Sequence, residues 1–326
     1  MLGYRLFRLL LQAVFVLLAV GTLCFAMAEL LPGDAAYRIA AGRYGYDVVN
    51  TEIAEAVRAE LHLDRPAFAR WAQWLGQLAQ GNLGHSLVLG DPVLDLVAYQ
   101  LGQTVWLSLV AWLMAVALGL SLGLWTALRP VGWTRRAVDG LNTVLRACPS
   151  FLLGVVLTTV LAVELDWLPV AGHEDANHVV LPALTLALAL CPGFTQVVRD
   201  AALKLLRSDA FEFAQVKGLP LHAALRRHAL PQILLATLAY AGVQLVLLVE
   251  GMVVAETLFA WPGIGHALVH AIIARDVPMV QATALTMALL FVLLSGAIDL
   301  LLHALDPRLA DAQAPQPSGN HTPATP

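Results

Sequence analysis

The fold of this chain is decided by a polar segment, residues 199–231, that separates two long apolar runs and contains the sequence Ser208-Asp209-Ala210-Phe211-Glu212-Phe213-Ala214-Gln215-Val216-Lys217-Gly218-Leu219-Pro220. The segment holds six of the 19 lysines and arginines of the chain. We expect it to lie in the cytoplasm, where it would form a docking surface for a soluble partner. The alternative is an ordinary basic loop that only sets the membrane topology.

The composition predicts an integral membrane protein surrounded by lipid. The 326 residues are 59% hydrophobic and 13% charged, and the mean hydropathy is +0.73. Soluble domains carry about 25% charged residues. A nucleic-acid partner is not expected, because the chain lacks the clustered basic surface that such binding requires.

Six apolar stretches are long enough to cross about 30 Å of hydrocarbon as helices of about 20 residues. Only helices are expected, because a backbone in lipid must satisfy its own hydrogen bonds. The fold class is therefore all-α, with six transmembrane helices within residues 1–308 and a disordered tail at 309–326. The helices are expected at about residues 9–30, 102–128, 140–165, 179–198, 232–255 and 280–305. The first stretch exceeds a signal-peptide core of about 7–15 residues, so we expect a retained helix, with cleavage as the alternative.

The distribution of lysine and arginine predicts the orientation. Basic residues occur before the first stretch, after the second and throughout residues 199–231, whereas the loop after the third stretch has none. Both termini should therefore be cytoplasmic. The long loop at residues 31–101 should lie outside and contain amphipathic helices at 51–63 and 67–78.

Several enzyme motifs are absent from the sequence. Only two lysines occur, Lys204 and Lys217, and neither follows a glycine, so there is no phosphate-binding P-loop. The metalloprotease and serine-hydrolase motifs are absent too. We therefore expect no enzyme activity in this chain, and any ATP hydrolysis should belong to another chain.

Residues 209–217 are expected to form a short helix that ends at Gly218, a glycine in the C-cap position. Pro220 prevents simple continuation, and a new helix is expected near Leu221. Such a helix would be a rigid knob that transmits the motion of a partner to the fourth and fifth transmembrane helices.

The pattern Glu212-x-Ala214-x-x-x-Gly218, followed by Leu230-Pro231, resembles the EAA loop of ABC importer permeases, although Phe213 replaces a common alanine. Further stretches are similar to the branch that imports dipeptides, oligopeptides and nickel. In order, they are Leu31-Pro32-Gly33-Asp34, Gly81-Asn82-Leu83-Gly84-His85-Ser86, Pro149-Ser150-Phe151, Leu181-Pro182-Ala183, Glu256-Thr257-Leu258-Phe259-Ala260-Trp261-Pro262-Gly263-Ile264-Gly265, Ala274-Arg275-Asp276-x-Pro278 and Leu305-Asp306-Pro307-Arg308.

The resemblance covers residues 4–308 and implies the type I ABC importer permease fold in a bacterial inner membrane. It implies a second homologous permease, two cytoplasmic ATP-binding subunits and an external substrate-binding protein. ATP and Mg would be bound by the ATPase partners, so no cofactor is expected in this chain. Peptides are the expected substrate, with nickel or a metal chelate as the alternative. The expected contacts with the ATPase subunit are Asp209, Glu212, Ala214, Lys217, Gly218 and Pro231.

Residues 256–265 break regular structure after the fifth transmembrane stretch. We consider two readings, the outer mouth of the pathway or a packed turn that only positions helices; the pathway residues would be Glu256, Trp261, Pro262 and Gly263. Glu250 lies in an apolar stretch, where a charge is costly. It could face the pathway or remain protonated near the outer boundary.

Histidines and cysteines are poor candidates for a metal site. His173 and His178 flank acidic residues, and His266 and His270 are four residues apart, but neither pair completes a known site. The three cysteines are far apart, in or beside apolar runs, and are interpreted as small buried residues. No metal site is expected.

Two smaller questions remain open on the sequence. Gly119 and Gly123 form a Gly-x-x-x-Gly pattern, which serves either dimerisation or internal helix packing.

Two other function classes are the alternatives to an ABC permease. An intramembrane hydrolase would need a nucleophile paired with a base, and an ion-coupled secondary transporter would need several ionisable groups at mid-membrane depth.

Overall fold

A computed structural model describes residues 2–305 except 31–32, 46, 62, 130, 219, 221–222, 224 and 226–228. This part of the chain is helical, and its only β-type pairing is an isolated bridge between His85 and Pro92. The predicted tail at residues 309–326 lies outside the described residues. The α-helices are α1 (Leu2–Leu30), α2 (Ala35–Tyr44), α3 (Thr51–Glu60), α4 (Ala67–Ala79), α5 (Val93–Leu128), α6 (Trp133–Ala147), α7 (Ser150–Leu157), α8 (Val180–Leu206), α9 (Asp209–Val216), α11 (Leu230–Leu258), α12 (Ile264–Ala274) and α13 (Val277–Leu305).

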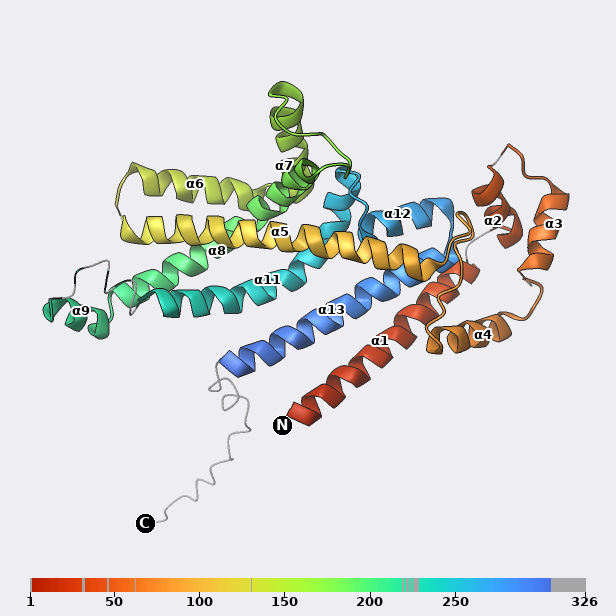
Figure 1. The fold of residues 1–326 in the computed structure, drawn as a ribbon, viewed down its shortest axis with the longest axis horizontal. Coiled ribbons are helices and arrows are strands. Elements are labelled where there is room, and N and C mark those ends of the chain that lie inside the picture. The colour runs from red at the N-terminus through yellow and green to blue at the C-terminus, as the bar shows by residue number, and fades with distance from the viewer. Residues whose placement is uncertain are drawn as a thin grey trace, which may run out of the picture.

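Long helices form an elongated bundle, with α9 at one end and α2, α3 and α12 at the other (Figure 1). Among the described residues, four helical segments are long and apolar enough to cross a membrane, and a bent pair makes up to five. These four segments are Leu6–Leu30, Val93–Leu128, Ala176–Leu206 and Val277–Leu300. In addition, α11 runs unbroken through the stretch expected at residues 232–255.

The expected single helix at residues 140–165 is wrong. α6 ends at Ala147, and a second segment, α7 continued by a π-helical stretch (Thr158–Glu164), runs at 112° to it. Pro149 causes the break, because the residue before a proline is driven out of the helical region. Accordingly, Cys148 is extended, with φ −88° and ψ 121°. α6 therefore lies beside α5 (Figure 1), while α7 departs from the direction of α6 and packs against α8 and α11.

The helices α5 and α8 approach closely through Gly119 and Gly123. A Cβ atom on Gly119 would lie 2.2 Å from the Cβ of Phe194, and one on Gly123 would lie 2.6 Å from the Cβ of Val198. No larger side chain fits without moving α8. Of the two roles left open for the Gly-x-x-x-Gly pattern, internal helix packing is the one observed.

The segment between α1 and α5 contains the two predicted amphipathic helices, α3 and α4, and both are confirmed. Asn50 caps α3 by accepting a hydrogen bond from the Ile53 N–H at 2.9 Å. α4 packs against α1, where Trp71 Nε1 donates to Thr22 Oγ1 at 3.3 Å. The segment between α1 and α5 is thus attached directly to α1.

Candidate functional site

The polar segment that follows α8 folds into the short helix α9, as predicted. Phe211 anchors α9, because its side chain is only 4% exposed and belongs to a cluster with Val198, Ala202 and Ile233. Ser208 begins the helix, and its carbonyl oxygen accepts a hydrogen bond from the Glu212 N–H at 3.1 Å. α9 therefore packs directly against the ends of α8 and α11.

Gly218 terminates this knob with φ +83°, a left-handed conformation that glycine adopts without steric cost. The predicted C-cap role of Gly218 is confirmed. Phe213 and Val216 are exposed, at 60% and 78%, so the free face of α9 presents apolar surface. The Lys217 ammonium lies 4.5 Å from the centre of the Phe213 ring. Asp209 and Glu212 are exposed on the first turn of the same helix.

The rest of the predicted coupling residues are only partly described. Pro231 lies exposed in the first turn of α11, between the buried residues Ala229 and Ile233. The side chain of Ala214 lies outside the described part of the chain, as do most residues between Gly218 and Ala229. The helix predicted near Leu221 is therefore not tested.

At the opposite end of the bundle, the Glu256 carboxylate is completely buried and bound on both oxygens. Thr104 of α5 donates its hydroxyl proton to Oε1 at 2.5 Å. The backbone N–H of Gly265 donates to Oε2 at 2.7 Å, and that of His266 at 3.2 Å. The carboxylate thus caps the N-terminus of α12, where unpaired N–H groups and the helix dipole favour negative charge.

Trp261 fills the turn between α11 and α12 and is only 4% exposed. Its indole Nε1 donates to the Gln103 carbonyl oxygen at 3.1 Å. Gly263 is required beside the carboxylate, because a Cβ atom there would lie 2.0 Å from Glu256 Oε1. In this chain, the contacts of Glu256, Trp261 and Gly263 match the packed-turn reading. The pathway role of these residues and of Pro262 stays a prediction.

The other candidates gain no support as ligands. The side chain of Glu250 lies outside the described residues, so its role is not tested. His178 has a local task, since its Nδ1 accepts a hydrogen bond from the Asp175 N–H at 3.1 Å. The His266 and His270 rings lie 4.3 Å apart. Among the described residues, no group of three or more His, Cys, Asp or Glu is placed to hold a metal.

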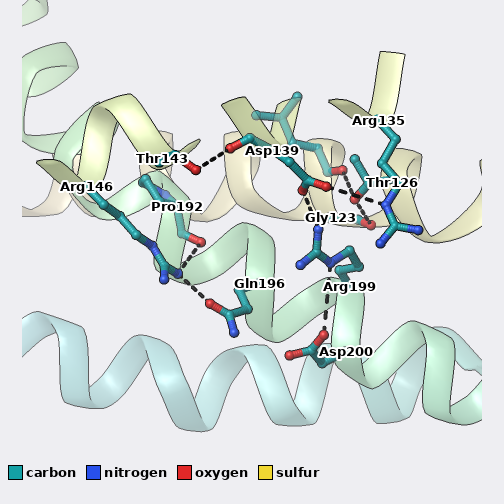
Figure 2. Close-up of polar contacts among 11 residues, drawn as sticks. Gly123, Thr126, Arg135, Asp139, Thr143, Arg146, Pro192, Gln196, Arg199 and Asp200 are labelled. Atoms are coloured by element: carbon teal, nitrogen blue, oxygen red, sulfur yellow. Dashed lines mark hydrogen bonds and ion pairs between the residues drawn. The ribbon is translucent and has the colours of Figure 1, made fainter. Parts of the chain in front are cut away.

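A polar cluster between α6 and α8 was missed by the sequence reasoning (Figure 2). Asp139 accepts from Arg199 Nη1 at 2.5 Å and lies 3.5 Å from Arg135 Nε. Arg146 Nη2 donates to Gln196 Oε1 at 2.6 Å and to the Pro192 carbonyl oxygen at 3.2 Å. Polar residues recur at helical spacing along α6, and this pattern could have indicated the cluster. It was overlooked because residues 140–165 were taken to be a transmembrane span.

The cluster lines a cavity of about 230 Å³ between the two helices. Its walls are Asp139, Asn142, Thr143 and Arg146 from α6, and Pro192, Thr195, Gln196 and Arg199 from α8. Two arginines and one aspartate give these walls one excess positive charge.

The helical architecture, with several apolar spans and a rigid knob at one end, defines a polytopic membrane protein of the permease class. The chain belongs to the family described as binding-protein-dependent transport system inner membrane component, which matches residues 119–311. It is therefore a permease subunit of an ABC importer, a transport component rather than an enzyme. The family implies ATPase and substrate-binding partners, and it selects this class over a secondary transporter or an intramembrane hydrolase.

Relatives match almost the full length of the chain. The glutathione transport system permease protein GsiC of Pectobacterium atrosepticum is 34% identical over 95% of this chain and 99% of its own length. GsiC of Escherichia coli K12 is 32% identical over the same shares. A putative peptide transport system permease protein of Brucella abortus is 34% identical over 91% of this chain and 96% of its own.

Solved structures support the fold alone. The methionine ABC transporter MetNI, in an inward-facing conformation, has a TM-score of 0.54 at 19% identity and covers 65% of this chain and 96% of the matched chain. An amino acid ABC transporter has a TM-score of 0.51 at 14% identity, with shares of 64% and 94%. About a third of this chain therefore has no counterpart in either structure.

Proposed function

We propose that this permease conducts peptides delivered by an external substrate-binding protein. The observation that carries the proposal is the match to peptide and glutathione permeases over 91–95% of the chain. Those matches include the proposed outer segment, residues 31–101, which lies outside the part of the chain that the family description covers. Glutathione is itself a small peptide, so the two names describe one chemical class. Nickel or a metal chelate is the alternative cargo within the same architecture.

The coupling knob is proposed to consist of α9 with Gly218 and the start of α11. Its exposed apolar and charged side chains would dock into a cytoplasmic ATP-binding subunit. The buried anchor Phe211 would pass movement of the docked subunit to α8 and α11. ATP and Mg would be held by the ATPase subunits, and this chain would supply no cofactor site.

The proposed assembly contains a second homologous permease, two ATPase subunits and one external binding protein in a bacterial inner membrane. Both termini would be cytoplasmic. The arrangement of the chain supports this orientation, because α9 and the outer helices α2 and α3 lie at opposite ends of the bundle (Figure 1).

Co-purification from the native membrane tests the knob. Wild type should recover a second permease and the ATPase subunits, whereas Gly218→Asp should lose the ATPase subunits. Gly45→Asp is a matched control on the outer segment, because Gly45 also has a positive φ, of +88°, and a Cβ atom there would meet no non-neighbouring atom within 4 Å. Equal recovery of the ATPase subunits by all three proteins would contradict the proposed docking role of α9 and Gly218.

Uptake tests the substrate class. Proteoliposomes that contain the complete importer should accumulate a labelled dipeptide only with ATP and the binding protein. Accumulation of nickel but not of peptide under the same conditions would favour the alternative cargo.

A further inference from the structure

The Arg146 side chain, from the last turn of α6, contacts Gln196 within a helical segment that is long and apolar enough to cross a membrane. Its partner Gln196 is about 16 residues from the start of α8, which corresponds to about 24 Å at 1.5 Å per residue. Both side chains are exposed in the isolated chain. An arginine exposed to hydrocarbon is costly, so a charged group beside a membrane-spanning helix is expected to face a water-filled cavity or another protein surface.

The charges around the cavity leave Arg146 available for an anion. Asp139 is already shared by Arg199 and Arg135, at 2.5 and 3.5 Å. The acceptors that Arg146 meets among the described residues are neutral, the Gln196 side-chain oxygen and the Pro192 carbonyl oxygen. Both bonds use the same nitrogen, Nη2, of a guanidinium that carries five N–H donors. Figure 2 shows the Arg146 side chain apart from the Asp139 group.

A second observation in the same cavity indicates a ligand with a donor. The Asn142 Oδ1 atom is buried and has no hydrogen-bond partner among the described residues. Buried polar atoms are nearly always paired, so an unpaired one in a cavity wall calls for a group that the isolated chain does not supply. Asn142 and Arg146 are four residues apart on α6 and therefore share one face.

We infer that the α6–α8 cavity binds the carboxylate end of a transported peptide, with Arg146 pairing the carboxylate and Asn142 accepting a hydrogen bond from a peptide N–H. This inference rests on the proposed function, because it assigns the chemical group that the permease recognises. The cavity of about 230 Å³ suits one end of a peptide rather than a whole oligopeptide. Its excess positive charge also disfavours a bare metal cation.

Equilibrium binding to the nucleotide-free membrane complex in lipid nanodiscs tests the inference. The external binding protein is omitted, so that binding reports on the membrane subunits. The probes are labelled dialanine and its C-terminal amide. Wild type should bind the free acid about tenfold more tightly than the amide, as the loss of a charge-assisted hydrogen bond predicts.

Arg146→Gln should bring the two affinities within about twofold, and Arg146→Lys should keep part of the preference. Arg136→Gln is the matched control, since Arg136 lies on α6 outside the cavity and its loss should leave the preference unchanged. The inference is overturned if wild type shows no preference, if Arg146→Gln retains it, or if Arg146→Gln loses the second permease from the complex. Failure of the proposed function is a separate result, the absence of ATP-dependent peptide uptake by the complete wild-type importer.

Discussion

The two ends of the molecule use conspicuous sequence motifs in opposite ways. At the α9 end, one buried side chain, Phe211, holds a helix on which Phe213 and Val216 are exposed. At the α12 end, Glu256 and Trp261 are both buried and both hydrogen-bonded to α5 or α12. Exposed apolar residues on a rigid knob suit contact with another protein, whereas a buried, fully bonded carboxylate stabilises its own chain. Replacing an exposed side chain of α9 should therefore weaken binding to another protein, whereas replacing a buried side chain beside α12 should destabilise the fold.

The largest effect is expected for Trp261→Ala. The change leaves a cavity beside Leu107 and Met252 and removes the bond to the Gln103 carbonyl, which should cost about 3–5 kcal/mol of unfolding free energy. Thermal unfolding of the purified protein in detergent measures this. Trp261→Phe separates the two readings of the turn. A Phe variant of near-normal stability that transports poorly would favour the pathway mouth over the packed turn.

A smaller loss is expected for Glu256→Gln, which keeps the shape and one acceptor oxygen for the α12 N–H groups. It removes the negative charge at the N-terminus of α12 and the acceptor that Thr104 uses, which should lower the unfolding free energy by about 1–3 kcal/mol. Limited proteolysis should then cut first near α12. The exposed Glu55→Gln change on α3 is the control, and equal stability of the two variants would show that the carboxylate does not hold α12.

The smallest effect on folding is expected for Phe213→Ala. Because Phe213 is 60% exposed, the unfolding free energy should change by no more than about 0.5 kcal/mol. Binding of the ATPase subunit should nevertheless weaken by about tenfold, as expected for an exposed aromatic anchor of an interface. A pull-down titration with the ATPase subunit measures the affinity. Unchanged affinity with normal folding would remove the contrast between the two ends.

Much of the fold was predictable, because the signals were local. Apolar length selected the long helices, and the helical spacing of apolar residues in amphipathic segments selected α3 and α4. Gly218 was identified as a helix terminator from its position, and it adopts the positive φ that this role requires. The failure at residues 140–165 arose when apolar length was given more weight than Pro149, although a proline acts on the residue directly before it.

The sites depended on contacts that no local signal specifies. Thr104 and Glu256 are 152 positions apart in the chain, and Arg146 and Gln196 are 50 apart. A sequence shows that an acid or an arginine lies in an apolar region, but not which donor or acceptor meets it. The membrane class, most of the long helices and the short helix α9 were therefore determined by the sequence itself, through local periodicity, capping and charge. The hydrogen bonds of the buried Glu256 carboxylate and the cavity at Arg146 were decided only by tertiary packing, because long-range partners satisfy a buried polar group once the helices are in place.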